Sequence, residues 1–158
     1  MRSWTVVTEQ RSIAGQTQTM PGCVLRIGSK RRDVEALVSA SGLKPIVIHR
    51  KGFPRIPGGT ALSPSSGFNV DVSRADGNVE KQFRDAIRFL KRHEPGLARL
   101  GRSKAFAGMT LDFGLYGHAT VERPWPSYRL PVTLIQLAGK YGIGIDLSFY
   151  GSRPKDGG

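Results

Sequence analysis

Hydrophobic and polar residues alternate along four separate stretches of the chain, which is the pattern of strands with one face in a core. These stretches are residues 23–28, 68–73, 105–116 and 143–149. The longest has Ala107, Met109, Leu111, Phe113 and Leu115 in one phase. A shorter apolar run at residues 46–49 also fits a strand. The pattern therefore predicts one sheet built from these segments.

Three other stretches have apolar residues at helical spacing, namely residues 30–41, 79–93 and 132–141. The second is the clearest, and its apolar stripe is Val79, Phe83, Ala86, Ile87 and Leu90. Gly42 is predicted to end the first helix in the left-handed conformation. Pro95 and Gly96 are predicted to break the second helix, with one more short helical turn around Leu97 and Leu100.

The predicted elements follow the order β-α-β-β-α-β-α-β. This order indicates an α+β domain with a single, mainly antiparallel sheet and helices packed on one face. The domain spans residues 23–151, after a flexible N-terminal arm or edge strand (1–22) and before a disordered tail (152–158). Two long surface loops are expected, at residues 51–66 and 117–129, because both are rich in proline or glycine.

Several short segments carry a family resemblance. They are Ser41-Gly42-Leu43-Lys44-Pro45, His49-Arg50-Lys51-Gly52, Leu137-Ala138-Gly139-Lys140-Tyr141-Gly142-Ile143 and Asp146-Leu147-Ser148-Phe149-Tyr150. With the strand at residues 23–28 and the helical region 79–100, they make residues 23–151 resemble the small bacterial proteins grouped as domain of unknown function 4279. That family implies no known activity, so the resemblance supplies no catalytic residue and no cofactor.

The charge of the chain is strongly unbalanced. Its 158 residues include 24 Lys and Arg against 12 Asp and Glu, a net charge of +12. Such a charge favours nucleic acid, anionic membrane or acidic protein as a partner. Cys23 is the single cysteine, so no intramolecular disulfide forms. Residues 1–22 lack the apolar stretch of a signal peptide, and no membrane-spanning stretch is present, so we expect a cytoplasmic protein.

Candidate catalytic and metal-binding residues are few. His49, His93 and His118 lie far apart in the sequence, without the paired spacing of a zinc site. Cys23 is expected in the core, where a thiol is inert. We therefore expect neither a metal nor a cofactor.

Three carboxylates share the outward phase of predicted strands: Asp71, Asp112 and Asp146. If their strands are neighbours, they converge on one sheet face, where paired carboxylates can do acid–base work. The competing interpretation is that they face water or pair with nearby arginines.

Basic residues form the most informative candidate site. Five fall in one sector of the helix 79–93, opposite its apolar stripe: Lys81, Arg84, Arg88, Lys91 and Arg92. Three more stand at the predicted start of the first helix, where cations oppose the helix dipole: Lys30, Arg31 and Arg32. A third group begins the first long loop: Arg50, Lys51 and Arg55.

These observations favour a non-enzymatic interaction module whose basic surface binds an acidic protein, as an immunity-type or regulatory bacterial protein does. The alternative is a nucleic-acid-binding protein that uses the basic helix and loop. A hydrolase that uses the outward carboxylates is a third hypothesis, and a merely solvated basic surface is the simplest one.

Overall fold

The computed structural model describes residues 22–75, 77–116, 121–122, 124 and 127–150. Within them lies one five-stranded sheet of order β2-β3-β1-β4-β5. The strands are β1 (Cys23–Ser29), β2 (Val47–His49), β3 (Ser66–Ser73), β4 (Phe106–Tyr116) and β5 (Ile143–Tyr150). Every neighbouring pair is antiparallel except β4 and β5, which are parallel. The predicted α+β class and mainly antiparallel sheet are confirmed.

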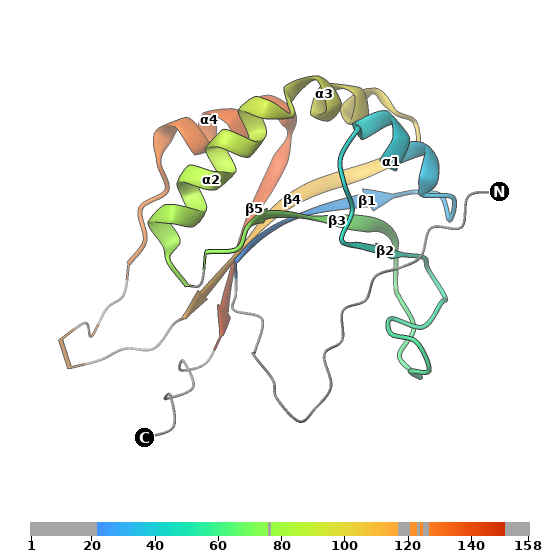
Figure 1. Ribbon diagram of the computed structural model, residues 1–158, viewed down its shortest axis with the longest axis horizontal. Coiled ribbons are helices and arrows are strands. Elements are labelled where there is room, and N and C mark those ends of the chain that lie inside the picture. Colours follow the sequence, from blue (N-terminus) through green and yellow to red (C-terminus); the bar gives the residue numbers. More distant parts are fainter. Residues whose placement is uncertain (1–21, 76, 117–120, 123, 125–126, 151–158) are drawn as a thin grey trace.

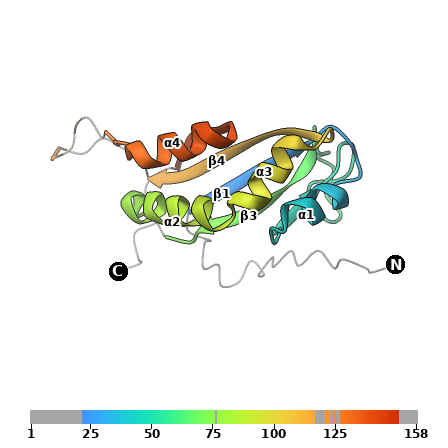
Figure 2. The same ribbon diagram turned by 90° about the horizontal axis from the view of Figure 1, so that it is seen from above.

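Four helices form a second layer over one face of this sheet (Figure 1). They are α1 (Glu35–Ser41), α2 (Val79–Arg92), α3 (Glu94–Arg102) and α4 (Val132–Tyr141). Seen from above, α2 and α1 lie at opposite ends of this layer with α3 between them (Figure 2). The other face of the sheet, which we call the open face, has none of these helices on it. No helix in the described ranges has the length and apolar character needed to span a membrane.

The core lies between the helices and the central strand β1. Cys23, Leu25 and Ile27 point toward the helices and are almost completely buried. Their cross-strand neighbours on the same face are Phe113, Leu111 and Met109 of β4. This alternation is the one that the sequence pattern predicts, because only every second side chain of a strand faces the core.

Helix α2 closes the core from above. Its N-cap Asn78 accepts a hydrogen bond from the backbone N–H of Lys81 at 3.0 Å. Phe83 packs edge-on against Phe113, with ring centroids 5.0 Å apart. The buried Gln82 donates through Nε2 to the carbonyl of Ala75 and to that of Gly114. These two bonds join the helix to the chain after β3 and to β4.

The prediction of one short helical turn after Pro95 is wrong, because α3 is a full helix of nine residues. Pro95 stands in its first turn, where a missing N–H costs nothing. A side chain at Gly96 would lie 2.0 Å from the carbonyl oxygen of Ser41. Glycine is therefore needed here for the close approach of α3 to α1.

The first helix is also shorter than predicted. It begins at Glu35 rather than at residue 30, and Asp33 accepts a hydrogen bond from the Glu35 N–H at 3.2 Å. Its predicted end is confirmed, because Gly42 has a φ of +66°.

The N-terminal arm, most of the loop at 117–129 and the C-terminal tail lie outside the described residues.

We predict that Phe83→Ala lowers the free energy of unfolding by about 3–5 kcal/mol, since it removes a buried ring from the core. The matched control is Phe53→Ala, because Phe53 is half exposed. The control is expected to change stability by less than about 0.5 kcal/mol. Urea unfolding of the three proteins measures both, and equal losses for the two variants would contradict the packing of α2.

Candidate anion-binding surfaces

The five basic side chains predicted on α2 are all exposed, opposite the buried Phe83, Ala86 and Leu90. We call this set the α2 ridge: Lys81, Arg84, Arg88, Lys91 and Arg92. Its position on the outer face of the helical layer confirms the helical phase read from the sequence. Whether it binds a partner stays a prediction.

Asp85 reduces the charge of the α2 ridge. Its carboxylate accepts hydrogen bonds from Lys81 Nζ at 2.8 Å and Ser73 Oγ at 2.7 Å, and Arg88 Nη1 lies 3.4 Å away. The bond from Lys81, then that from Ser73, holds the pKa of Asp85 below its usual range. Among the described residues, no ion pair involves Arg84, Lys91 or Arg92. The middle of the ridge is therefore less attractive to anions than its length suggests.

Lys30, Arg31 and Arg32 lie in the turn between β1 and α1, and all three are exposed. Because α1 begins only at Glu35, these cations do not stand in its first turn. The prediction that they oppose the helix dipole is therefore wrong. Their side chains still point outward from one end of the sheet, so their role in anion binding rests on position alone.

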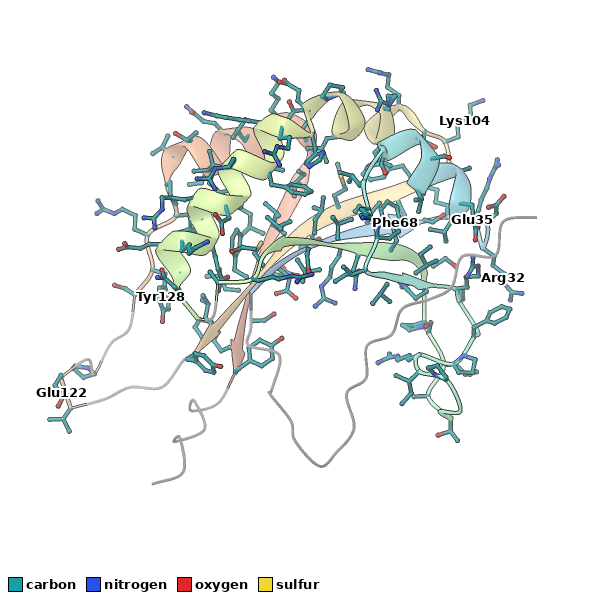
Figure 3. The ribbon with its side chains drawn as sticks, in the orientation of Figure 1. Arg32, Glu35, Phe68, Lys104, Glu122 and Tyr128 are labelled. Atoms are coloured by element: carbon teal, nitrogen blue, oxygen red, sulfur yellow. The ribbon has the colours of Figure 1, made fainter. Side chains whose placement is uncertain are left out.

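The structure brings this turn next to the third basic group, although about twenty residues separate them in sequence. Arg50 forms an ion pair with Glu35, close to the turn. A guanidinium nitrogen of Arg32 lies 3.7 Å from the position that a side chain at Gly52 would take. Figure 3 shows Arg32 and Glu35 at this end of the molecule. We call the combined set the basic end: Lys30, Arg31, Arg32, Arg50, Lys51 and Arg55.

Lys104 adds to this end of the molecule, where Figure 3 labels it above Glu35. The backbone N–H of Lys30 donates to the carbonyl of Ala105 at 2.8 Å, which places Lys30 beside the start of β4. Sequence reasoning did not identify Lys104 as part of a basic surface. The signal was weak, because a lone Lys before a strand is ordinary.

The three outward carboxylates do lie in one row on the open face. Asp71 on β3 and Asp112 on β4 both pair with Val24 of β1, and Asp146 on β5 pairs with Asp112. Asp112 and Asp146 are therefore direct neighbours, while β1 separates them from Asp71. The three carboxylates therefore share one face of the sheet, as expected if their strands are neighbours, but only Asp112 and Asp146 are adjacent.

Asp112 is nevertheless fully engaged. It is only 7% exposed, and its Oδ2 accepts from Arg26 Nε at 3.0 Å and from the second guanidinium nitrogen. Ser148 Oγ donates to its other oxygen at 2.5 Å. Asp71 accepts from Arg74 Nε at 2.9 Å. Sequence reasoning missed Arg26, whose outward position on β1 was the available signal.

These contacts favour a structural role for the row of carboxylates over acid–base chemistry. An acid–base pair needs a carboxylate oxygen that is free to meet a substrate, whereas both oxygens of Asp112 already accept hydrogen bonds. The geometry fits the alternative interpretation, in which outward strand carboxylates pair with arginines. The charge pair joins β1 to β4 across the open face, and the Ser148 hydrogen bond adds β5.

The family model described as "Domain of unknown function (DUF4279)" matches residues 17–152. The chain belongs to the DUF4279 family. The resemblance read from the sequence is thereby confirmed. No curated protein and no solved structure matches the chain.

The remaining titratable groups can be placed only where the structure describes them. In the described part of the chain, no three His, Cys, Asp or Glu side chains are placed to hold a metal ion. Burial, then the charge of Asp112, raises the pKa of the Cys23 thiol far above its usual range. Burial, then Arg26, lowers the pKa of His49, and burial, then Arg92, lowers that of His93. His118 lies outside the described residues.

We predict that Asp85 stabilises the fold in a pH-dependent way. Because its pKa is lower in the folded state, the unfolded chain takes up the proton first as the pH falls. The stability that Asp85 adds over Asp85→Asn is then present above about pH 4 and lost below it. Urea unfolding of both proteins at about pH 7 and about pH 2.5 measures the gap. A gap that widens in acid would refute the pairing.

We further predict that Arg26→Met destabilises the domain by about 2 kcal/mol or more, because it leaves the buried Asp112 carboxylate without its countercharge. The double variant Arg26→Met with Asp112→Asn is expected to recover most of that loss. Denaturant unfolding of the single and double variants completes the cycle. Simple additivity of the two changes would mean that the pair does not couple.

Proposed function

We propose that this DUF4279 domain is a non-enzymatic cytoplasmic interaction module, of an immunity-type or regulatory kind, whose basic surface binds an acidic protein. The observation that carries the proposal is the convergence of two separate basic segments at the basic end. Two carboxylates lie near these six cations. Asp33 accepts a hydrogen bond from the α1 backbone, and Glu35 forms an ion pair with Arg50. A concentration of unpaired positive charge attracts and orients an anionic surface.

The α2 ridge serves in this proposal as a second, weaker attraction. It lies at the far end of the helical layer from α1, so the two basic surfaces do not form one short patch (Figure 2). Asp85, in the middle of the ridge, repels phosphates as well as partner carboxylates. Long-range attraction by Arg84, Lys91 and Arg92 raises the rate of encounter more than it adds to the final contact.

An acidic protein suits these surfaces better than a nucleic acid does. Duplex DNA presents one negative charge per about 1.7 Å along its axis, and proteins that follow it use a continuous run of cations. Here the basic surfaces are separated, and the ridge contains a carboxylate. Phe53, Ile56 and Leu62 are also about half exposed in the segment that carries Arg55, and apolar side chains of this kind are common in the centre of protein interfaces.

We predict that poly-L-glutamate, used as a probe for an acidic surface, binds the wild-type chain at low salt. The basic-end variant replaces Lys30, Arg31 and Arg32 with Gln, and it is expected to weaken binding about tenfold or more. The ridge variant replaces Arg84, Arg88 and Arg92 with Gln, and its loss is expected to be a few-fold. Both variants keep nearly wild-type stability, since these side chains are exposed.

The matched control removes three charges elsewhere: Lys44, Arg74 and Lys140 replaced by Gln. It loses the same net charge, so an equal loss of binding would show that only total charge matters and would contradict a basic end.

Titration of labelled duplex DNA over several salt concentrations tests the alternative, a nucleic-acid partner. Tighter binding to DNA than to poly-L-glutamate, with a steep salt slope that the basic-end variant flattens, would favour a nucleic-acid partner.

A further inference from the structure

The loop between β2 and β3 folds back on itself as a short hairpin at residues 52–63. The Gly52 N–H donates to the Ser63 carbonyl at 2.9 Å, and the Ser63 N–H donates to the Phe53 carbonyl at 2.8 Å. Nearer the tip, the Arg55 N–H donates to the Ala61 carbonyl at 2.9 Å. The loop predicted from its proline and glycine content therefore has a regular, hydrogen-bonded shape. We call it the hairpin loop.

The hairpin loop is fastened at its base. Ser63 and Ser66 are both buried, and the hydroxyl of Ser66 accepts from the Lys51 N–H at 2.9 Å. Pro54 and Pro57 restrict the backbone further. Figure 1 shows the loop hanging from one end of the sheet, away from the helical layer. A projecting loop with a fixed backbone loses little conformational entropy when it binds.

Three large apolar side chains of the hairpin loop remain exposed. Phe53 is 53% exposed, Ile56 is 48% exposed and Leu62 is 54% exposed. Single exposed hydrophobic residues are ordinary, but three within ten residues of one projecting loop are not. None of the three belongs to the core, and about half of each remains in contact with solvent. Their distribution along both arms of the loop suits a groove or pocket on another protein.

Positive charge surrounds these apolar side chains. Arg50 and Lys51 stand at the base of the hairpin loop, and Arg55 lies within it, its Nε donating to the Leu62 carbonyl at 3.3 Å. The sequence contains no Asp or Glu between Glu35 and Asp71. A surface that complements the loop therefore has an apolar centre and an acidic rim, the common anatomy of a protein interface.

We propose that the hairpin loop is the docking element for the partner, inserting Phe53 and Leu62 into an apolar pocket rimmed by carboxylates. This inference rests on the proposed function and specifies its partner. An apolar wedge in the DNA minor groove is the competing use of such a loop. A wedge engages a single apolar residue at the tip, a position that Ile56 holds here, where its carbonyl accepts from the Gly59 N–H at 3.0 Å. Phe53 and Leu62 stand instead on the two arms, where Pro54 and Leu62 are bridged, so the exposed apolar surface extends well below the tip and suits a pocket better than a wedge.

The test compares two polymers of equal length and at equal salt: poly-L-glutamate and the 4:1 copolymer of Glu and Tyr. The copolymer offers apolar side chains among carboxylates, so the wild type is expected to bind it about tenfold more tightly, the gain from burying part of one aromatic ring. The loop variant Phe53→Ser with Leu62→Ser is expected to bind both polymers equally. Its affinity for poly-L-glutamate is expected to stay at the wild-type value.

The control variant Val132→Ser with Ile135→Ser removes two exposed apolar side chains from α4 instead. It is expected to keep the preference for the copolymer. Circular dichroism checks that each variant is folded, and Phe53→Ser alone serves as a second loop variant, expected to lose part of the preference.

Each result has a defined meaning. A preference that survives in the folded loop variant, or that the control loses equally, overturns the docking role. Binding of neither polymer overturns both proposals. If the wild type binds the copolymer through the loop but does not bind poly-L-glutamate, the charge-based function is overturned and the docking role is supported. Tighter wild-type binding to duplex DNA, reduced in the loop variant, overturns the docking role in favour of a groove-inserted wedge.

Discussion

Strand β1 is paired on both sides, and its register fixes nearly everything else. Leu25 and Ile27 point into the core, while Val24 and Arg26 point to the open face. A slip of one residue against β3 or β4 would bury Arg26 and expose Leu25, which would strongly destabilise the fold. The same register places Arg26 beside Asp112, and it sends the chain into the Lys30 turn at one end of the sheet.

The helical layer is held to this sheet by a small number of specific contacts. Gln82 donates to two carbonyls below α2, and Ser73 donates to Asp85 from the sheet. Gly96 lets α3 approach α1 closely enough to contact the Ser41 carbonyl. Because the buried face of each helix is committed to these contacts, the basic residues of α2 are left on the outer surface.

The sequence pattern predicted those features of the fold that a few neighbouring residues determine. The alternation of Cys23, Leu25 and Ile27 indicated the sheet, and Gly42 indicated a helix end, because each depends on a few neighbouring residues. Pattern failed where a distant contact decides: the break after α2 was predicted, but the segment that follows is a packed helix of nine residues rather than one turn, and Gly96 lets it lie against Ser41. Likewise, no periodicity connects Arg32 with Gly52, so the joining of two basic segments was not predictable from spacing. The hydrogen-bonded form of the hairpin loop was hidden for the same reason.

The positions of the acidic residues explain where the positive charge is left over. Asp112 binds Arg26, Asp71 binds Arg74, Asp85 binds Lys81 and Arg88, and Glu94 binds Lys140. These pairs neutralise cations on the open face, on α2 and beside α4. The long stretch between Glu35 and Asp71 has no carboxylate of its own. Arg50 pairs with Glu35, but the other cations of this stretch and those of the Lys30 turn form no ion pair among the described residues, and several of them lie around the exposed apolar side chains of the hairpin loop. Exposed hydrophobic groups are costly to leave in water, and clustered cations repel one another, so a partner with an apolar pocket and an acidic rim relieves both.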